Sequence, residues 1–460
     1  MDLNRKIRFG VLVDSDTLEW WQQDTVKLLI NNGIEHVLTA KDIDIDIASN
    51  LDFILSFKSQ NPSDEIIKSP KYGVWKLVFN ALREFMDKIP NSKVILQQLS
   101  CNKDKCLILK SIQLDTILHS YKAHLDRLFK EAEILPLQAC KDLIVNGKLE
   151  PEEIQNWKLR PLKYNALKYY WLCIWRRIAF HFNYLFRQED WNIGYRIGNE
   201  PIKWLKPRKS EYFADPFVIT TKDDTYLFFE WFSNKNGKAD LAIAKKSENF
   251  EIYHKITDFP EHRSYPFIFE YQGVIYCIPE AHKTNKISLY RFVETRHGAS
   301  LQWNYDLIDG CCVDSTLYHH SDGKWYLFTT PREQSHTHLL IFVADDLRGP
   351  YKPHYNNPVK VDCRSSRMAG KIQNTDGDLV RPGQNSTHHY GESITLNKII
   401  KLDEYQYIEK EIKEIKPDKN WRYNKGIHTI NSDGDITVFD AKRFTFTFRG
   451  FIQQIKQRFH

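Results

Sequence analysis

The sequence predicts a multidomain protein in which an N-terminal α/β domain precedes an all-β propeller of five blades. The chain has 460 residues, which is too long for one compact domain. Strand-like and helical runs alternate up to about residue 150, whereas short strands and turns dominate from Trp191 onward. A hairpin unit also recurs in this second part. We therefore expect domains at 1–150 and 191–460, joined by an amphipathic, aromatic, helical connector at 151–190.

The first domain is predicted from runs of two different periodicities. Short apolar runs at Arg8–Val13, Phe53–Phe57 and Val94–Leu99 are typical of strands. The runs Asp24–Asn32 and Ser120–Glu133 have the spacing of amphipathic helices. Because the two kinds of run alternate along the chain, they predict a mixed α/β domain.

The connector contains a segment, 164–187, with the composition of a helix that lies on a membrane surface. Its apolar side chains recur at helical spacing, and Tyr and Trp flank them. A helix packed between two domains explains the same pattern, so both interpretations stay open. No charge-free apolar stretch reaches the ~18 residues that span a bilayer. The apolar positions are Leu167, Trp171, Ile174, Ile178 and Leu185, and the cations are Lys168, Arg176, Arg177 and Arg187.

Composition and short motifs exclude several classes of function. Lys and Arg number 65 and Asp and Glu 59, and the resulting net charge of +6 is too small to indicate a protein that binds nucleic acid over its whole surface. Glycine-rich nucleotide motifs are missing and the histidine clusters lack a third ligand, so we expect no metal and no bound cofactor. The apolar run Phe9–Val13 is too short for a signal peptide. Eight scattered cysteines fit a reducing compartment, so we expect a cytoplasmic protein, free or peripheral at the inner face of the membrane.

The propeller is predicted from repeated hairpins. Each unit is a strand, a tight turn and an aromatic second strand. The first three units begin at Asp215, Tyr265 and Asp314, which are 50 and then 49 residues apart. Two less regular units begin at Arg381 and His428. A period of about 50 residues with about four strands is typical of propeller blades, whereas a β-sandwich, the alternative, does not repeat at a fixed period.

A candidate site follows from this architecture. The first strand of each blade lines the central channel, so the five starting residues should converge on one pocket. Asp215 and Asp314 are two of these residues, and Glu230 and Glu280 end second strands at the same offset of 15 residues. Carboxyl pairs serve glycosyl chemistry, one as proton donor and the other as base or nucleophile. Glu280 follows an apolar run, which favours a raised pKa and the role of donor.

We therefore predict two groups of site residues. The alternative is structural, since an Asp at the start of an inner strand also caps turns or pairs with Arg between blades. The predicted catalytic residues are Asp215, Glu280 and Asp314, and the predicted substrate-binding residues are Glu230, Tyr265, Arg381 and His428.

Several dispersed motifs of the last 270 residues carry a family resemblance. They include Trp191–Gly194, the FADPF motif around Asp215, Ile278–Ala281, Val313–Ser315 and Tyr390-Gly391. With these motifs the chain resembles the β-propeller module of glucosamine inositolphosphorylceramide transferases and their bacterial relatives. That module is similar in fold to five-bladed furanosidases of the arabinanase and invertase type. The resemblance implies that Asp215 lies where those glycosidases have their base or nucleophile, with Asp314 and Glu280 as partner carboxylates.

The first 150 residues resemble the formyltransferase-like domain that often precedes this propeller in bacterial sequences. The matching pieces are Ile7–Asp14, Leu51–Phe57, Tyr72–Trp75 and Arg83–Phe85. A working formyltransferase needs a His for proton transfer, and this chain has Val78 or Phe79 where that His is expected. The resemblance therefore implies a degenerate domain that serves as a scaffold or as a partner surface, without formyl transfer.

Three functions remain open at this point. The favoured one is a carbohydrate-active enzyme of cell-surface polysaccharide or glycolipid assembly, which transfers a glycosyl unit to a glycan or lipid-linked acceptor. Its donor would be a sugar nucleotide or a lipid-linked sugar, acting as co-substrate. The alternatives are a glycoside hydrolase of furanosidase type that uses the same carboxylates, and a non-catalytic scaffold that binds glycans through aromatic stacking and carboxylate hydrogen bonds.

Overall fold

The computed structural model describes residues 6–102, 104–155, 165–256, 259–281, 283–295 and 298–458. The chain divides into two compact units, Met1–Ile178 and Ala179–His460. The division falls within the long helix α7 (Ala166–Phe186). Residues 156–164 of the expected connector, including the first residue of the segment 164–187, lie outside the described residues.

The N-terminal unit is built on one mixed sheet of seven strands. Its first four strands, in the order β2-β1-β3-β4, run parallel, and the next three pair antiparallel. The strand bounds are β1 (Arg8–Leu12), β2 (Glu35–Ala40), β3 (Phe53–Ser56), β4 (Val74–Val78), β5 (Asn91–Gln98), β6 (Lys105–Asp115) and β7 (Glu152–Gln155). Because β7 pairs with β6, the unit continues beyond the expected boundary at residue 150.

Six helices accompany this sheet in the described residues of the unit. The helices α1, α2 and α3 alternate with the parallel strands. At the end of β4, Phe79 packs edge-on against Trp21 and Phe129, so its ring serves packing. The likeness to formyltransferases stays a prediction. The helices are α1 (Trp20–Asn31), α2 (Ile45–Ser49), α3 (Asp64–Lys68), α4 (Ala81–Asp87), α5 (Tyr121–Ala132) and α6 (Ile134–Asn146).

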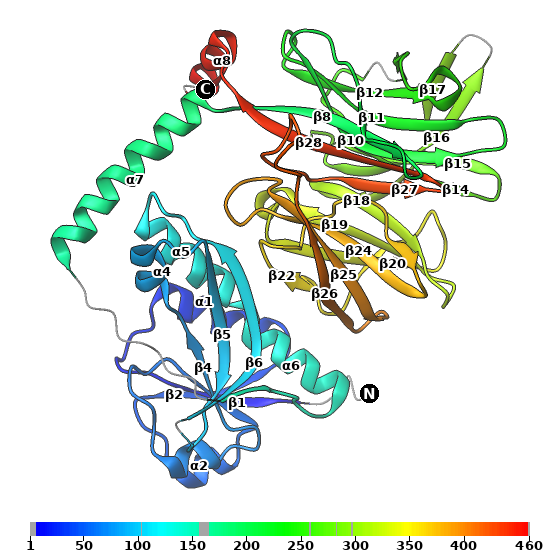
Figure 1. Cartoon of the computed structure of the whole chain (residues 1–460). Helices are drawn as coiled ribbons and strands as arrows, with labels where there is room; N and C mark the ends of the chain where they lie inside the picture. The colour runs from blue at the N-terminus through cyan, green and yellow to red at the C-terminus, as the bar shows by residue number, and fades with distance from the viewer. Residues whose placement is uncertain are drawn as a thin grey trace. The chain divides into compact units, whose positions relative to one another are not determined.

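The second unit consists of five antiparallel sheets, each forming one blade (Figure 1). The predicted five-bladed propeller is thereby confirmed. Blade 1 is β10 (Glu211–Thr220), β11 (Thr225–Ser233), β12 (Lys238–Lys245) and β13 (His254–Lys255). Blade 2 is β14 (Ser264–Tyr271), β15 (Val274–Glu280), β16 (Lys286–Thr295) and β17 (Gly298–Asp309). Blade 3 is β18 (Cys312–His319), β19 (Trp325–Pro331), β20 (His338–Ala344) and β21 (Lys352–Pro353), with β22 (Lys360–Val361) beside β20.

Blade 4 keeps the sequential hairpin order, whereas blade 5 combines strands from the two ends of the unit. Blade 4 is β23 (Gln373–Thr375), β24 (Asp378–Asn385), β25 (Ser393–Leu402) and β26 (Tyr407–Ile415). Blade 5 joins the two ends of the unit, because β27 (Ile430–Asp433) and β28 (Ile436–Thr445) pair with β8 (Gln188–Ile197) and β9 (Lys203–Trp204). The pairing of β28 with β8 runs over ten residue pairs and closes the ring. Helix α8 (Phe448–Arg458) follows β28.

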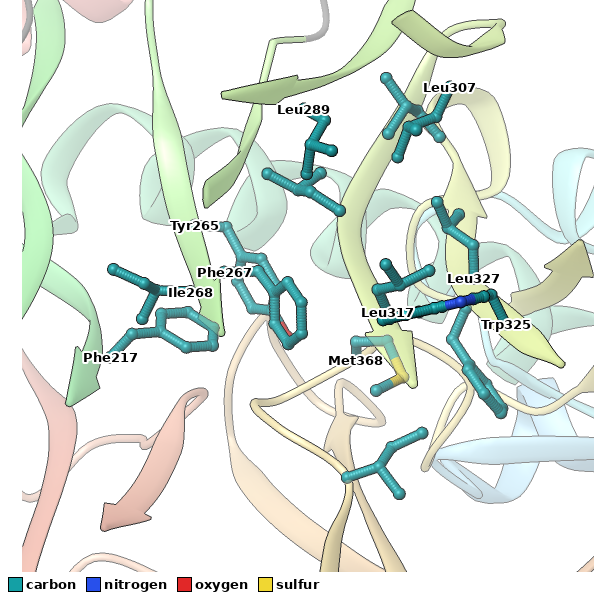
Figure 2. Close-up of a cluster of buried hydrophobic side chains, with 14 of the residues drawn as sticks. Phe217, Tyr265, Phe267, Ile268, Leu289, Leu307, Leu317, Trp325, Leu327 and Met368 are labelled. Carbon is teal, nitrogen blue, oxygen red and sulfur yellow. The ribbon is translucent and has the colours of Figure 1, made fainter. Parts of the chain in front are cut away.

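The faces between the blades form the core of the propeller. Figure 2 shows part of it, where Phe217 of blade 1, Tyr265 and Phe267 of blade 2, and Trp325 of blade 3 lie in one cluster with Met368. All five side chains are buried. The abundance of aromatic residues in the sequence is therefore explained largely by packing between blades.

The structure does not place Arg381 in the predicted substrate site. Arg381 lies in β24, the second strand of blade 4, and its guanidinium is fully buried. It hydrogen-bonds Glu409 at 2.7 and 2.8 Å, the Ser365 carbonyl at 2.6 Å and the Tyr407 hydroxyl at 3.1 Å. The sequence repeat predicts Arg381 at the start of the first strand of its blade, but Arg381 lies in the second strand. The prediction is one strand off because the innermost strand, β23, does not carry the hairpin pattern of the other blades.

We predict that Arg381→Met destabilises the propeller by about 3 kcal/mol, because it leaves the buried Glu409 carboxylate without its main partner. The double variant Arg381→Met/Glu409→Leu should recover much of this loss, since both charges are then gone. Denaturant unfolding of the full chain, followed by tryptophan fluorescence, measures both effects. Lys398→Met, which breaks a half-exposed pair with Asp378, is the control and should cost less than about 1 kcal/mol. Equal losses in the single variant and this control would contradict the prediction.

Candidate functional site

A bulge in the innermost strand marks three blades at the same place. The register of β10 with β11, of β14 with β15 and of β18 with β19 shifts by one residue near the start of each inner strand. The bulge contains Asp215, Tyr265 and Asp314, with φ angles of 51°, 43° and 50°. Such left-handed values are uncommon outside glycine. The repeat anchors found in the sequence are therefore residues with a special backbone conformation.

The bulges aim backbone N–H groups at carboxylates of the neighbouring blade. Asp440, at the centre of β28, accepts hydrogen bonds from the N–H groups of Asp215 at 2.9 Å, His428 at 3.0 Å and Thr429 at 3.0 Å. Asp215 in turn accepts from the N–H of Tyr265 at 3.1 Å and from the Thr429 hydroxyl at 2.9 Å. Blades 5, 1 and 2 are thus linked in sequence through buried carboxylates.

His428 lies between the carboxylates of Asp440 and Asp215. Its Nδ1 is 2.7 Å from an Asp440 oxygen and its Nε2 is 3.5 Å from an Asp215 oxygen. The imidazole stacks on Trp191 with centroids 4.0 Å apart and meets the edge of Tyr390 at 5.1 Å. Burial lowers the pKa of His428, but Asp440 and Asp215 outweigh it and raise the pKa above its ordinary value. The environment therefore favours the imidazolium.

A second cation, Arg367, holds the other two predicted catalytic residues. Its Nε and Nη2 contact the Asp314 carboxylate at 2.5 and 3.2 Å, and Nη2 lies 3.9 Å from Glu280. The Gln384 amide also donates to Asp314 at 2.9 Å, and the guanidinium lies 5.1 Å from the Tyr390 ring centre. Burial raises the pKa of Asp314 to about 7, although Arg367 lowers it.

Glu230 is a buried carboxyl whose pKa is raised. It ends the inner part of β11 and is buried beside Asp215. Burial raises the pKa of Glu230 well above its usual range, and the charges of Asp215 and Glu280 raise it further. Asp215 is also a hydrogen-bond partner of Glu230, and a hydrogen bond between two carboxyls requires one of them to carry a proton. Burial raises the pKa of Asp215 as well, although His428 lowers it. We call Glu230 and Asp215 the acid pair.

Glu230 is a second candidate for the proton donor, beside Glu280, which the sequence favours. Glu280 lies 3.9 Å from the Arg367 guanidinium. The cation that faces Glu280 comes from blade 4 and could not be inferred from the apolar residues that precede Glu280 along the chain.

The structure brings five of the seven predicted side chains together and leaves two aside. The Tyr265 hydroxyl points into the core, 3.0 Å from the Thr316 hydroxyl, and accepts from the Gly370 N–H at 2.9 Å. Tyr265 serves the site only through its backbone N–H. Arg381 belongs to the interior of blade 4. The residues that act on one another's charges at the centre are Asp215, Glu230, Glu280, Asp314 and His428.

Sequence reasoning missed three residues of this centre. Asp440 lies in the second strand of blade 5, as Glu230 and Glu280 do in blades 1 and 2. The recurrence of an acidic residue in second strands could therefore have identified it from the sequence. Tyr390 appeared only within a motif of the family resemblance. Arg367 precedes β23 in a stretch without hairpin pattern, so no signal in the sequence pointed to it.

One group of side chains at this centre has the spacing of metal ligands. Donor atoms of Asp215, His428 and Asp440 lie within 4.8 Å of one another. Both ring nitrogens of His428 face these carboxylates, so a cation here would take the place of the imidazolium proton. The expectation that no metal takes part stays a prediction.

A cavity of about 500 Å³ lies near the acid pair, although neither Asp215 nor Glu230 lines it. Tyr212 and Phe232, stacked with centroids 4.5 Å apart, form part of its wall, and Phe232 is two residues from Glu230 in β11. Tyr212 is half-buried, and burial and then the charges of Glu230 and Asp215 raise its pKa. The other wall comes from β8, β28 and helix α8, including Glu189 and Gln454.

Solved structures with related architecture include several glycoside hydrolases. The chain is similar to Zg3597, a family 117 glycoside hydrolase from Zobellia galactanivorans, with 14% identity and a TM-score of 0.36 over 56% of this chain and 91% of that one. It is also similar to a thermostable family-43 glycoside hydrolase, with 14% identity and a TM-score of 0.37 over 54% of this chain and 90% of that one.

Curated relatives match the propeller more strongly in sequence. Glucosamine inositolphosphorylceramide transferase 1 of Oryza sativa subsp. japonica is 31% identical over 254 residues, 51% of this chain and 34% of that protein. The protein of the same name from Arabidopsis thaliana is 33% identical over 213 residues, 44% of this chain and 27% of that protein. The match thus spans about a third of the length of these relatives.

The sequence model of one family matches residues 203–440, which is more than half of the chain. These residues contain Asp215, Glu230, Glu280, Asp314 and Asp440, so the whole centre lies inside the match. The chain belongs to the family described as glucosamine inositolphosphorylceramide transferase 1, N-terminal.

Proposed function

We propose that the centre of the propeller transfers a glycosyl unit to a glycan or lipid-linked acceptor during assembly of a glycolipid or cell-surface polysaccharide. The observation that carries this proposal is the acid pair, in which Glu230 has a raised pKa and is a hydrogen-bond partner of Asp215. The printed name of the curated relatives, a transferase of glucosamine and inositolphosphorylceramide, supports the same class of reaction.

The acid pair provides the proton steps of such a transfer. Asp215 accepts the proton of the acceptor hydroxyl while that oxygen bonds to the anomeric carbon of the donor. The bond from this carbon to the leaving oxygen breaks, and the leaving group takes the electron pair. The proton of Glu230 is then available to the leaving oxygen. Asp314 and Glu280, fixed by Arg367, offer oxygens to the sugar hydroxyls.

The contact within the acid pair differs from the carboxyl spacing of glycoside hydrolases. The carboxyls of glycosidases lie about 5–5.5 Å apart when they retain configuration and about 6.5–9.5 Å apart when they invert it. Glu230 and Asp215 are hydrogen-bond partners and are therefore closer together than in either class.

A non-catalytic glycan-binding scaffold is the second candidate. It is favoured by one observation, that Asp215, Asp314 and Asp440 are all held by protein donors. In that case the centre would stabilise the ring, and the stacked rings of Tyr212 and Phe232 would contact sugar.

We also propose that the protein works at the inner face of the cytoplasmic membrane, through helices α7 and α8. Between Ala166 and Phe186 there is no acidic residue, and many large apolar side chains of α7 are exposed, including Trp171 and Ile174 at 59% and 62%. Within the propeller unit, Phe186 packs against Phe446 and Phe451, which adds the start of α8 to this surface.

The partner that fits the exposed apolar face of α7 and the start of α8 is an anionic lipid surface. The exposed aromatic rings of this face are typical of side chains at the boundary between lipid tails and headgroups, and its cations on α7 include Lys168 and Arg177. No described helix is both long enough and apolar enough to cross a bilayer.

Asp215→Asn should lower transfer by about 10²–10⁴-fold while the protein stays folded, because an amide cannot accept the proton of the acceptor. Asn also adopts a left-handed φ, so the bulge is preserved. Cells whose only copy carries this variant should lose the lipid-linked saccharide or surface glycan, measured by extraction and mass spectrometry. Asp223→Asn, at the exposed turn of the same blade, is the matched control. Normal glycan in Asp215→Asn cells, with glycan binding lost, would favour the scaffold instead.

Stability should fall as pH rises, because Glu230 and Asp314 have raised pKa values in the folded protein. An acid of this kind stabilises the fold below its unfolded pKa and loses that contribution as pH passes its folded pKa. For Asp314 the window runs from its usual value of 3.8 to about 7. Glu230→Gln stays neutral, so the melting temperature of this variant should fall less between these pH values than that of the wild type.

The control for this measurement is Glu333→Gln, which changes an exposed carboxylate of blade 3. Its melting temperature should follow the wild-type pH profile. If Glu230→Gln follows that profile as well, the acid pair does not hold a proton at neutral pH.

Vesicles of phosphatidylcholine that contain phosphatidylglycerol should sediment the protein, and vesicles of phosphatidylcholine alone should do so much less. Trp171→Glu/Ile174→Glu should weaken the binding about tenfold or more, because it places anions in the centre of the apolar face. Ile400→Glu/Ile408→Glu, on exposed propeller strands, is the matched control. Equal sedimentation of the two variants would remove α7 as the contact.

A further inference from the structure

A second cavity, of about 590 Å³, has a strongly basic wall. Five cations line it against only two carboxylates. The cations come from the segment between β9 and β10, from the segment before β27, and from β28. We call this cavity the basic pocket. Its cations are Lys206, Arg208, Lys209, Arg422 and Arg443, and its carboxylates are Asp190 and Glu211.

Three of these cations have no anionic partner among the residues that the structure describes. Arg443 pairs with Asp190 at 2.7 Å, and Lys206 pairs with Glu251 at 3.0 Å. The three cations without an ion pair are Arg208, Lys209 and Arg422. The cations around this cavity repel one another, so an anion that binds among them is stabilised.

One ring fixes the arginines of the basic pocket. Tyr423 is buried, and its ring centre lies 5.1 Å from the Arg443 guanidinium and 5.8 Å from that of Arg422. An aromatic face restricts the orientation of a guanidinium group, so that its planar N–H donors point in fixed directions. Such fixed donors can bind two oxygens of a phosphate at once.

The basic pocket adjoins the cavity beside the acid pair. The two cavities share wall residues from three segments, so a ligand can extend from one into the other. Tyr212 lies on the far wall, close to Glu230 and Asp215. The shared residues are Asp190, Lys209, Ser210, Glu211 and Arg443.

We propose that the basic pocket binds the phosphate or diphosphate of the substrate, next to the sugar that reacts at the acid pair. This inference rests on the proposed transfer and names the chemical class of its substrate, a sugar joined to phosphate. When the bond between the anomeric carbon and the phosphate oxygen breaks, the phosphate keeps the electron pair. Arg208, Lys209 and Arg422 stabilise the added negative charge.

The phosphate has two chemical sources. A nucleoside diphosphate sugar carries it in a soluble donor, where the phosphate is the leaving group. A lipid-linked acceptor carries it as a headgroup phosphodiester, which stays intact and only anchors the substrate. Both present the same oxygens to the basic pocket, so competition experiments must separate them.

Inorganic pyrophosphate is the probe for the basic pocket. Calorimetric titration of the full chain should show binding that weakens with rising ionic strength. Arg208→Gln/Lys209→Gln/Arg422→Gln should weaken it by at least about 30-fold, because charge-assisted hydrogen bonds are lost. The control, Lys222→Gln/Lys410→Gln/Lys413→Gln, removes three exposed cations elsewhere on the propeller and should change the affinity less than about twofold at the same ionic strength. Undetectable binding, or equal effects of the two triple variants, would overturn the proposal.

Two competitors identify the source of the phosphate. Displacement of pyrophosphate by uridine diphosphate supports a nucleotide donor, and displacement by glycerophosphoinositol supports a lipid headgroup. If neither compound competes, the pocket does not bind the phosphate of a substrate and the proposal is overturned.

The same titration separates this inference from the proposed function. Asp215→Asn should bind pyrophosphate as the wild type does, because Asp215 does not line the basic pocket. If Asp215→Asn keeps full transfer activity, the proposed role of the acid pair is contradicted, whereas the proposed phosphate binding is not. If the triple pocket variant binds pyrophosphate normally, the proposed phosphate binding is contradicted, whereas the role of the acid pair is not.

Discussion

Buried carboxylates held by the next blade's backbone are the interaction on which this propeller centre depends. An ionised carboxylate inside a protein costs several kcal/mol unless hydrogen bonds and opposite charges compensate it. Asp440 receives the N–H of Asp215, and Asp215 receives the N–H of Tyr265, so each blade compensates a charge of its neighbour. The left-handed bulges exist because only this backbone conformation turns those N–H groups toward the channel.

The same network decides the protonation of the site. Asp215, Glu230, Glu280, Asp314 and Asp440 are gathered there, whereas Arg367 and His428 are the cations whose contacts compensate them. A buried cluster with more acids than cations retains protons, and the proton is held where no cation compensates the charge. Among the residues that the structure describes, Glu230 forms no ion pair with Arg367 or His428, and its basic neighbour is His262, whose Nε2 lies 3.8 Å from a Glu230 oxygen. Burial and the neighbouring carboxylates raise the pKa of Glu230, so a residue suited to donate a proton is also part of the structural centre.

Closure of the ring places the other functional surfaces around this centre. The pairing of β28 with β8 joins the two ends of the propeller unit, and both strands line the cavity beside the acid pair. The basic pocket shares a wall with that cavity, and α8 contributes to the cavity on one side and to the aromatic face on the other.

The sequence by itself determined the number of blades and most of the acidic centre. Hairpins are local, so a repeat of turns and aromatic strands fixes each blade. Equal offsets placed Asp215 and Asp314 at equivalent positions of first strands, and Glu230 and Glu280 at equivalent positions of second strands. Only the tertiary structure decided that Arg381 belongs to the interior of blade 4, that Arg367 reaches the centre, and that the pKa of Glu230 is raised well above its usual range. These outcomes depend on charges brought together from different blades, and the Coulomb energy between two residues follows their distance in space, which the spacing along the chain does not give.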